Sequence, residues 1–245
     1  MATAQANPFV ARLSHGAALS SEDVELLDAL VAHPATVPAR TELVAQGDPA
    51  SLMRVVLDGY ACRFKILPDG RRAIVALMLP GDICDLHVEV LGRMDHAIAT
   101  ISECRVAQMR HEAVEAAAAA SPAIARALWW STLAEGSISR EWLTNMGRRR
   151  SDRQMAHLFC EIHARLEAVG LADGESFPFP VTQEELADML GIAPVHAHRV
   201  LQGLRGQGLV ADRDRRVTIP DLRRLRAFAG FDPDYLHLDA ALYRT

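Results

Sequence analysis

Short apolar runs that alternate with turn signals are the feature that most constrains the fold of this 245-residue chain. They extend from about residue 34 to 110, and the turns between them carry Gly, Pro and Asp, as in Pro68-Asp69-Gly70 and Pro80-Gly81-Asp82. Each run has the length of one strand, and no long helix separates them. This spacing predicts an antiparallel barrel or jelly roll. The expected strands are Met53–Leu57, Tyr60–Leu67, Arg71–Leu79, Ala97–Ile101 and Arg105–Met109.

The pattern of residues 111 to 147 is helical instead. Ser121-Pro122 predicts a helix start, with serine as the N-cap and proline in the first position. After this start, seven positions on one face of the helix recur at alternating spacings of four and three residues, which is a heptad pattern. They are Ile124, Leu128, Ser131, Glu135, Ile138, Trp142 and Asn145.

Two interpretations of this heptad are open. The helix packs on its own barrel, or it pairs with the same helix of a second copy. We expect the pairing, because Trp129, Trp130, Leu133 and Leu143 leave apolar surface around the rest of the helix. The expected dimerisation residues are Ile124, Leu128, Ile138 and Trp142.

A helix-turn-helix pattern follows the segment Arg148-Arg149-Arg150, at which we expect a hinge and a domain boundary. Thr182 and Glu185 form a capping box, Gly191 supplies the turn, and Pro194 begins a second helix. The second helix has one apolar stripe, which we expect to be buried. It consists of Ala197, Val200, Leu201 and Leu204.

The opposite face of this second helix has side chains suited to base edges. It is centred on Val195, Arg199 and Gln202, and His196 and His198 flank it. Arginine pairs with guanine, glutamine pairs with adenine, and valine can contact a thymine methyl group. The sequence therefore predicts a reading helix for the major groove of double-stranded DNA.

Residues 208–219 predict a β-hairpin, or wing, with arginines in or beside its tip. A plain helical hairpin with solvated charges is the alternative, and it leaves the cap, the turn and the wing unexplained. The expected DNA-binding residues are Thr182, Gln183, Pro194, Val195, His196, His198, Arg199, Gln202, Arg213, Arg215 and Arg216.

The composition excludes several other classes of protein. The net charge is −5. Lys65 is the one lysine and lies in no Gly-Lys-Ser or Gly-Lys-Thr motif, so a P-loop nucleotide hydrolase is excluded and a Schiff-base enzyme is not expected. The four cysteines form no CxxC pair, no apolar run reaches membrane length, and no secretory signal is visible. We therefore expect a cytoplasmic protein with no membrane partner.

An enzyme with a cupin-like metal pocket is the competing class. Such a pocket needs His-x-His followed by Glu and a later His on barrel strands. His87, Glu89 and His96 lack that spacing. We therefore expect neither catalytic residues nor a metal site.

Taken together, these segments resemble the Crp/Fnr superfamily of bacterial transcription regulators. The resemblance extends from about Leu19 to Leu238. It is carried by Gly47–Ala50, Val55–Gly59, Leu67–Arg71, Leu79–Asp82, Val181–Ala187 and Phe231–Leu236.

The resemblance implies an α+β fold: an N-terminal antiparallel β-roll (jelly roll), a long dimerisation helix and a C-terminal winged helix-turn-helix. The corresponding domains are residues 1–120, a sensor similar to cyclic-nucleotide-binding domains, residues 121–147 and residues 148–245. It also implies a homodimer on a near-palindromic operator and a contact with RNA polymerase. Arg199 matches the base-reading arginine of the family, whereas Pro194 and Val195 occupy the two other reading positions. A different operator sequence is therefore expected.

The sensor departs from the cyclic-AMP-binding members of the family. Their phosphate-binding arginine is missing from its place, and only Arg93 could substitute for it. Cys84 and His87 are similar to the haem ligands of the carbon-monoxide-sensing members, although they lie three residues apart instead of two. The oxygen-sensing members of the family hold an iron–sulfur centre with a cysteine cluster near the N-terminus. No cysteine precedes Cys62 here, so the resemblance does not imply such a cluster. The candidate effector residues are Cys84, Asp85, Leu86, His87, Arg93, Asp95 and His96.

Several alternatives for the sensor therefore remain open: a cyclic nucleotide, a haem, a redox role for Cys84, another small molecule, or no effector. A cyclic-nucleotide module that controls a partner protein is a further alternative. Activation and repression of transcription are both open as well.

Overall fold

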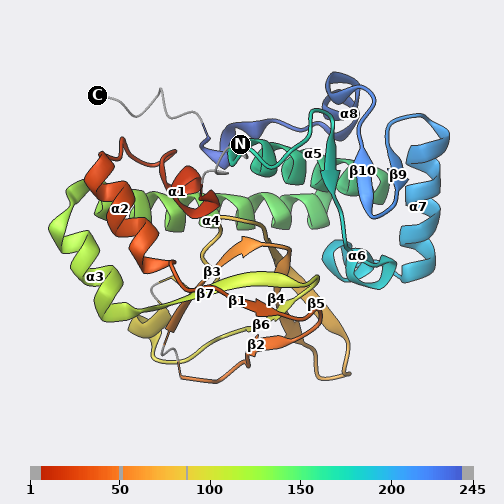
Figure 1. The fold of residues 1–245 in the computed structure, drawn as a ribbon. Helices are drawn as coiled ribbons and strands as arrows, with labels where there is room; N and C mark the ends of the chain where they lie inside the picture. Colours follow the sequence, from red (N-terminus) through yellow and green to blue (C-terminus); the bar gives the residue numbers. More distant parts are fainter. Residues whose placement is uncertain (1–6, 50–51, 87, 239–245) are drawn as a thin grey trace.

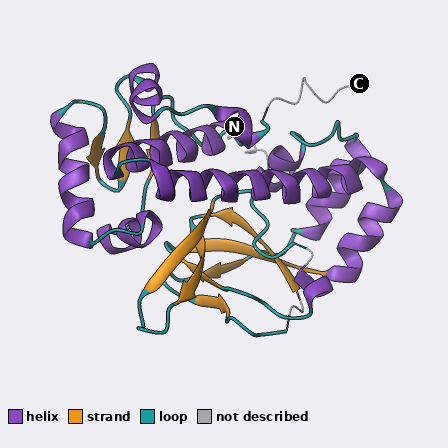
Figure 2. Ribbon diagram, turned by 180° about the vertical axis from the view of Figure 1, so that it is seen from behind, coloured by secondary structure: helices purple, strands orange, loops and turns teal. Residues whose placement is uncertain are grey.

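The long helix α4, Pro122–Arg148, organises the molecule. The computed structural model describes residues 7–49, 52–86 and 88–238. In Figure 1, two small sheets lie below α4, and α5 and the C-terminal elements lie above it and at its right-hand end. Figure 2, seen from behind, shows α4 running uncovered across the front of the molecule.

The β-roll below α4 consists of two antiparallel sheets, with strand orders β1-β7-β3 and β2-β6-β4-β5. The five expected strands are confirmed within one residue at most ends. Two three-residue strands, β1 and β2, were not expected, because strands this short carry little alternation. The strands are β1 Ala35–Val37, β2 Glu42–Val44, β3 Leu52–Asp58, β4 Ala61–Ile66, β5 Arg72–Met78, β6 Ala97–Thr100 and β7 Cys104–Arg110, and the 3-10 helix η1 is Val88–Leu91.

Three shorter helices lie beside the roll at the opposite end of α4 from the C-terminal elements (Figure 1). The side chains of Phe9 and Leu13 on α1 are fully buried, so α1 is part of the core. A capping box between Ser20 and Asp23 begins α2, as its sequence indicates. These helices are α1 Pro8–Leu13, α2 Ser21–Leu30 and α3 His111–Ala120.

The C-terminal part has the winged-helix architecture that the sequence predicts. Helix α5 is buried along most of its length, and a third antiparallel sheet has the order β8-β10-β9. The elements are α5 Ser151–Ala168, β8 Ser176–Pro178, α6 Gln183–Leu190, α7 Pro194–Gly206, β9 Ala211–Arg213, β10 Arg216–Thr218, α8 Leu222–Ala229 and the 3-10 helix η2 Pro233–Leu236.

The C-terminal part packs directly on the roll. Arg72 of β5 forms an ion pair with Asp188 of α6 at 2.8 Å, and the Tyr60 hydroxyl donates to the carbonyl oxygen of Pro178. Leu77 and Leu79 of the roll belong to the same apolar core as the helices of the C-terminal part. A change of orientation between the two parts would therefore break both polar and apolar contacts.

The four residues that we expected to pair with a second copy lie inside the chain. Ile124 and Leu128 pack in one core with Phe9 of α1 and strand β3, and Ile138 and Trp142 pack in another core with α5. All four side chains are at most 8% exposed, so a second copy cannot reach them. This assignment was therefore wrong: on this face the heptad reports packing within the chain, which was the other interpretation.

The outer face of α4 carries the apolar surface that remains. Trp129, Leu133 and Leu143 are 62%, 66% and 67% exposed. Together with Gly136 they lie at spacings of four, three and seven residues along the helix, which is a heptad register with Arg140 at the intervening position. We call Trp129, Leu133, Gly136 and Leu143 the outer stripe.

Candidate nucleic-acid interface

The start of α6 is held by the capping box that the sequence indicates. The Thr182 hydroxyl accepts from the Glu185 amide at 3.2 Å, and the Glu185 carboxylate accepts from the Thr182 amide at 2.8 Å. Gly191, at φ 65°, ends α6 in the left-handed conformation that glycine adopts without strain. Pro194 then begins α7. This geometry fixes the angle at which α7 leaves α6.

Helix α7 presents a polar face to solvent, as expected. Its stripe of Ala197, Val200, Leu201 and Leu204 is buried against the core. On the opposite face Arg199 and Gln202 are exposed, and Val195 is 65% exposed. Because these three side chains share one outward face, a single major groove can receive them together.

The two histidines that flank this face tie α7 to neighbouring elements. Nε2 of His196 lies 2.8 Å from the Ser151 hydroxyl oxygen at the start of α5. Nδ1 of His198 lies 3.0 Å from the side-chain nitrogen of Gln183 on α6. Both histidines are exposed. The start of the reading helix is therefore braced from two sides.

The wing is a tight hairpin of β9 and β10. Its two tip residues, Asp214 and Arg215, have φ values of 52° and 57°, as a two-residue type I′ turn requires. Between the wing and the start of α6 lies a groove whose lining includes five of the expected DNA-binding residues. They are Thr182, Gln183, Arg213, Arg215 and Arg216.

The wing arginines differ in how strongly they are held. The Arg213 side chain is 90% exposed and pairs with Asp214 at 3.3 Å. That of Arg216 is 40% exposed and lies 3.7 Å from the Asp173 carboxylate. Exposed pairs of this kind contribute little to stability, so the guanidinium groups are available to a phosphate backbone.

Those candidate effector residues of the roll that the structure describes do not form one open site. Cys84 is fully buried, and burial raises the pKa of its thiol, which disfavours the thiolate that metal ligation and redox chemistry need. Asp85 is buried in an ion pair with Arg54 at 2.6 Å, and burial raises the pKa of this carboxyl group. Leu86 is half-buried, and His87 lies outside the described residues.

Of the remaining three candidates, Asp95 and His96 contact each other, whereas Arg93 has a different partner. Nδ1 of His96 lies 2.7 Å from the Asp95 carboxylate, which also lies 3.4 Å from the Lys65 ammonium group. Burial lowers the pKa of His96. Arg93 donates to the carbonyl oxygen of Gly47 at 3.0 Å. None of these side chains lines the cavity between the roll and α4.

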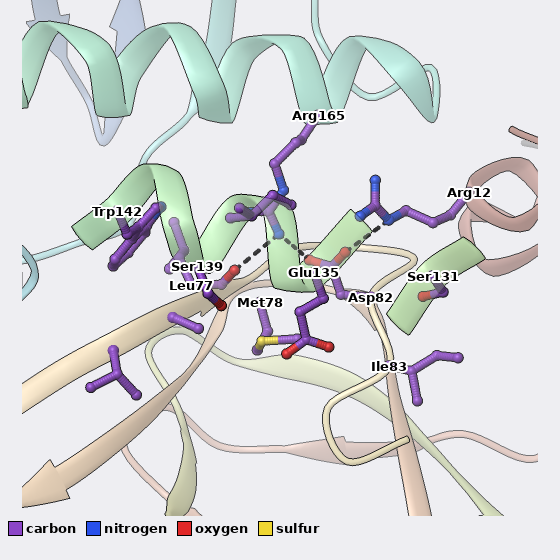
Figure 3. Close-up of a pocket in the computed structure, with 13 residues that line it drawn as sticks. Arg12, Leu77, Met78, Asp82, Ile83, Ser131, Glu135, Ser139, Trp142 and Arg165 are labelled. Atoms are coloured by element: carbon purple, nitrogen blue, oxygen red, sulfur yellow. Dashed lines mark hydrogen bonds and ion pairs between the residues drawn. The ribbon is translucent and has the colours of Figure 1, made fainter. Parts of the chain in front are cut away.

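That cavity holds charged residues that our sequence analysis did not single out. Figure 3 shows Asp82 between Arg12 of α1 and Arg165 of α5. The Asp82 carboxylate lies 3.0 Å from Nε of Arg12 and accepts a short hydrogen bond from Arg165. Arg165 also pairs with Glu161 at 3.0 Å. We call Arg12, Asp82, Glu161 and Arg165 the central ion cluster.

A half-buried arginine joins the roll to α4. Arg63 of β4 forms an ion pair with Glu135 of α4 and donates to the carbonyl oxygen of Cys84 at 2.7 Å. The sequence signals for these arginines are weak. Arg12 lies in an apolar helical segment, but Arg63 and Arg165 share their elements with other charged residues, so the sequence does not show that they are buried.

Two properties of the described residues bear on other functions. In that part of the chain, no group of three or more His, Cys, Asp or Glu residues is arranged to hold a metal ion. None of the helices formed by these residues is long and apolar enough to cross a membrane.

Comparison with known proteins agrees with this geometry. The model of the cyclic nucleotide-binding domain matches residues 34–121, and that of the Crp-like helix-turn-helix domain matches residues 153–228. The chain is 29% identical to transcriptional activator protein FnrL of Cereibacter sphaeroides, over 78% of each chain. It is 27% identical to nitrogen fixation regulation protein FixK of Azorhizobium caulinodans, over 79% of this chain and 77% of the relative.

A solved structure shows the same arrangement. FixK2 of Bradyrhizobium japonicum superimposes with a TM-score of 0.71 at 25% identity, over 80% of this chain and 96% of that chain. The fold class and the family therefore agree with the expectation from sequence. The chain belongs to the Crp/Fnr superfamily and is a DNA-binding transcriptional regulator of that type, not an enzyme.

Proposed function

We propose that this regulator acts as a homodimer that pairs through the outer stripe of α4 and binds a near-palindromic operator with two copies of α7. One observation carries the proposal: the outward face of α7 combines Val195, Arg199 and Gln202 above a groove lined by wing arginines. Base-reading side chains and phosphate-binding side chains are thus grouped on one part of the molecule.

The outer stripe supports the dimer. Three large apolar side chains, each more than 60% exposed, stand on a 27-residue helix. Exposed apolar surface of this kind marks an interaction site more often than a free surface. Gly136 lies between Leu133 and Leu143, and a glycine there permits close approach of a second helix. The occupant we propose is the same stripe of a second copy, because a heptad spacing suits helix pairing.

We further propose that the central ion cluster transmits changes in the roll to the winged helix, with residues 145–150 as the hinge. Asp82 belongs to the roll, while Glu161 and Arg165 belong to the first helix beyond the hinge. An effector would have to bind two arrangements of this cluster with different affinity. FnrL is named a transcriptional activator, which favours activation over repression, and an activator would contact RNA polymerase.

Substitution of Arg199 by alanine tests the reading helix. Duplexes would first be enriched from a random pool with the wild-type protein, and their binding then measured by fluorescence anisotropy. We expect Arg199→Ala to weaken binding to the enriched sequence by about 1–3 kcal/mol per bidentate contact, with binding to unrelated DNA nearly unchanged. The control is Arg110→Ala, which removes a 79% exposed arginine from the roll.

Each outcome of this binding experiment has a different interpretation. Equal affinity of wild-type protein and Arg199→Ala for the enriched sequence would show that α7 does not read bases. Equal loss in Arg110→Ala would show a general effect of charge. Failure of the wild-type protein to enrich any sequence would overturn sequence-specific binding by this purified protein.

A further inference from the structure

The segment Arg148-Arg149-Arg150 between α4 and α5 presents its arginines alternately outward and inward. Arg149 and Arg150 have extended backbones, with φ, ψ of −89°, 147° and −68°, 151°. Successive side chains of extended backbone point to opposite sides. Arg149 turns inward, where its guanidinium group lies 2.7 Å from the Glu141 carboxylate and its side chain is 20% exposed. Arg148 and Arg150 are exposed.

The two outward arginines are weakly held. The Arg150 side chain is 85% exposed, and the ion pair that it forms, with Asp152, spans 3.7 Å. An exposed pair at that distance contributes little, so it does not compete with a phosphate group. Within the described residues, the structure gives Arg148 no ion pair. Neither guanidinium group therefore has a strong ion pair within the part of the chain that the structure describes.

Hydrogen bonds hold the backbone that carries these arginines in the arrangement that the structure shows. The buried side chain of Gln154 donates to the carbonyl oxygens of Asn145 at 2.9 Å and Arg149 at 3.0 Å. These bonds tie the end of α4 to the start of α5. In this arrangement of the hinge, two exposed guanidinium groups thus project from a backbone held by hydrogen bonds, which lowers the entropy lost when they bind an anion.

The same segment adjoins the reading helix. Ser151, the residue after Arg150, is hydrogen-bonded at 2.8 Å to His196 in the first turn of α7. Figure 1 shows α5 and α7 at the right-hand end of the molecule, toward which α4 runs. DNA held by α7 therefore passes close to Arg148 and Arg150.

The dimer proposed above places this segment near the two-fold axis. Arg148 lies five residues beyond Leu143 of the outer stripe, a rise of about 7.5 Å along the helix. Two copies of α4 that pair in parallel thus bring two copies of Arg148 and Arg150 together between the two reading helices. A dimer that seats its reading helices in successive major grooves faces the minor groove between them.

We propose that Arg148 and Arg150 bind the phosphates that border this central minor groove. The affinity for DNA then depends on the shape of the spacer, which is the set of base pairs between the two half-sites of the operator. A narrow minor groove brings its two phosphate rows together and has a more negative potential. A·T-rich tracts narrow the groove, so the protein prefers them in a spacer that α7 never touches. This inference rests on the dimer and the reading helix of the proposed function.

The experiment compares the full-length wild-type protein with the double variant Arg148→Ala/Arg150→Ala. The matched control is Arg71→Ala/Arg110→Ala, which removes two arginines that are 77% and 79% exposed on the roll. The probes are the enriched operator with its spacer replaced by an A·T tract or by G·C pairs. Affinity is measured between 50 and 200 mM salt, and hydroxyl-radical footprinting locates the protected sugars.

We expect the Arg148→Ala/Arg150→Ala variant to bind DNA with a shallower salt dependence. Four arginines in the dimer contribute about 3 to 4 to the slope of log affinity against log salt. A fourfold rise in salt therefore weakens wild-type binding about 100-fold more than it weakens binding of the variant. The preference for the A·T spacer and the central footprint are lost, while preference for the half-site bases is kept. Arg148→Lys/Arg150→Lys keeps the charge and restores the slope.

Other outcomes overturn the inference. An unchanged slope, an unchanged spacer preference or a retained central footprint in the alanine variant would show that these arginines do not contact the spacer. An equal change in the control would trace the effect to net charge. If the wild-type protein selects no sequence, or if Arg199→Ala keeps its half-site preference, the proposed function itself fails; in the first case this inference fails with it.

Discussion

At the scale of single residues, the central ion cluster is the least expected feature of this regulator. Asp82 is contacted by arginines from α1 and α5, and the side chains of Arg12, Arg165 and Asp82 are each at most 7% exposed. Charges are buried at this cost only when partners compensate them. Asp82 comes from a turn with a recognisable sequence, but its partners lie 70 and 83 residues away along the chain. Local sequence therefore indicates the turn and does not indicate the cluster.

Removal of Arg165 is expected to destabilise the protein strongly. Arg165→Met keeps most of the apolar stem but leaves Glu161 and Asp82 with less compensation, which costs about 3–5 kcal/mol for a buried pair. Chemical denaturation at one fixed protein concentration measures this loss. Arg71→Met is the control, because Arg71 is 77% exposed and its loss is expected to cost about 0.5 kcal/mol or less. Similar losses in the two variants would contradict the buried role of Arg165.

At the scale of elements, α4 has two apolar faces, one buried and one exposed. One face packs on the roll and on α5, and the outer stripe remains exposed. Both faces follow heptad-like spacings, so periodicity predicts a helix with apolar faces but does not tell which face a second copy would meet. The alternation of the strands, by contrast, was sufficient for the roll, because turns at short intervals leave few other topologies.

Leu133→Glu is expected to convert the protein to a monomer. The substitution places two carboxylates against each other across the proposed two-fold axis, in an interface from which water is excluded. Sedimentation equilibrium measures the molecular mass in solution. Leu91→Glu is the matched control, since Leu91 is 72% exposed on the roll and far from the outer stripe in sequence. A Leu133→Glu protein that remains a dimer would place the interface elsewhere.

At the scale of the whole molecule, His157 lies where α4, α5 and the C-terminal segment meet. Its ring stands 5.0 Å from that of Phe231 and 5.8 Å from that of Tyr235, and its side chain is 1% exposed. Burial, with the nearby charge of Arg149, lowers the pKa of His157 to about 4, and Glu141 opposes this shift. The folded protein therefore holds a neutral imidazole at neutral pH.

This residue makes stability depend on pH. Below about pH 6.5 the unfolded chain takes up a proton on His157 that the folded chain resists until about pH 4. The contribution of His157 is thus fully present above pH 6.5 and is lost as the pH falls toward 4, by up to about 3 kcal/mol. Urea denaturation from pH 7.5 to 4.5 is expected to show a smaller decline in His157→Gln. Parallel curves for the two proteins would contradict this assignment.

The sequence by itself determined the parts of this protein that rest on local interactions. Capping residues, turn glycines, the start of α7 at Pro194 and the alternation of the strands act over a few positions, so they indicate the roll, the long helix and the reading face with Arg199. Tertiary structure alone decided which face of α4 is buried, which arginines meet Asp82, and that Arg149 turns inward while Arg148 and Arg150 turn outward. The reason is physical: burial and ion pairing depend on segments that are distant in sequence and meet only when the chain has folded.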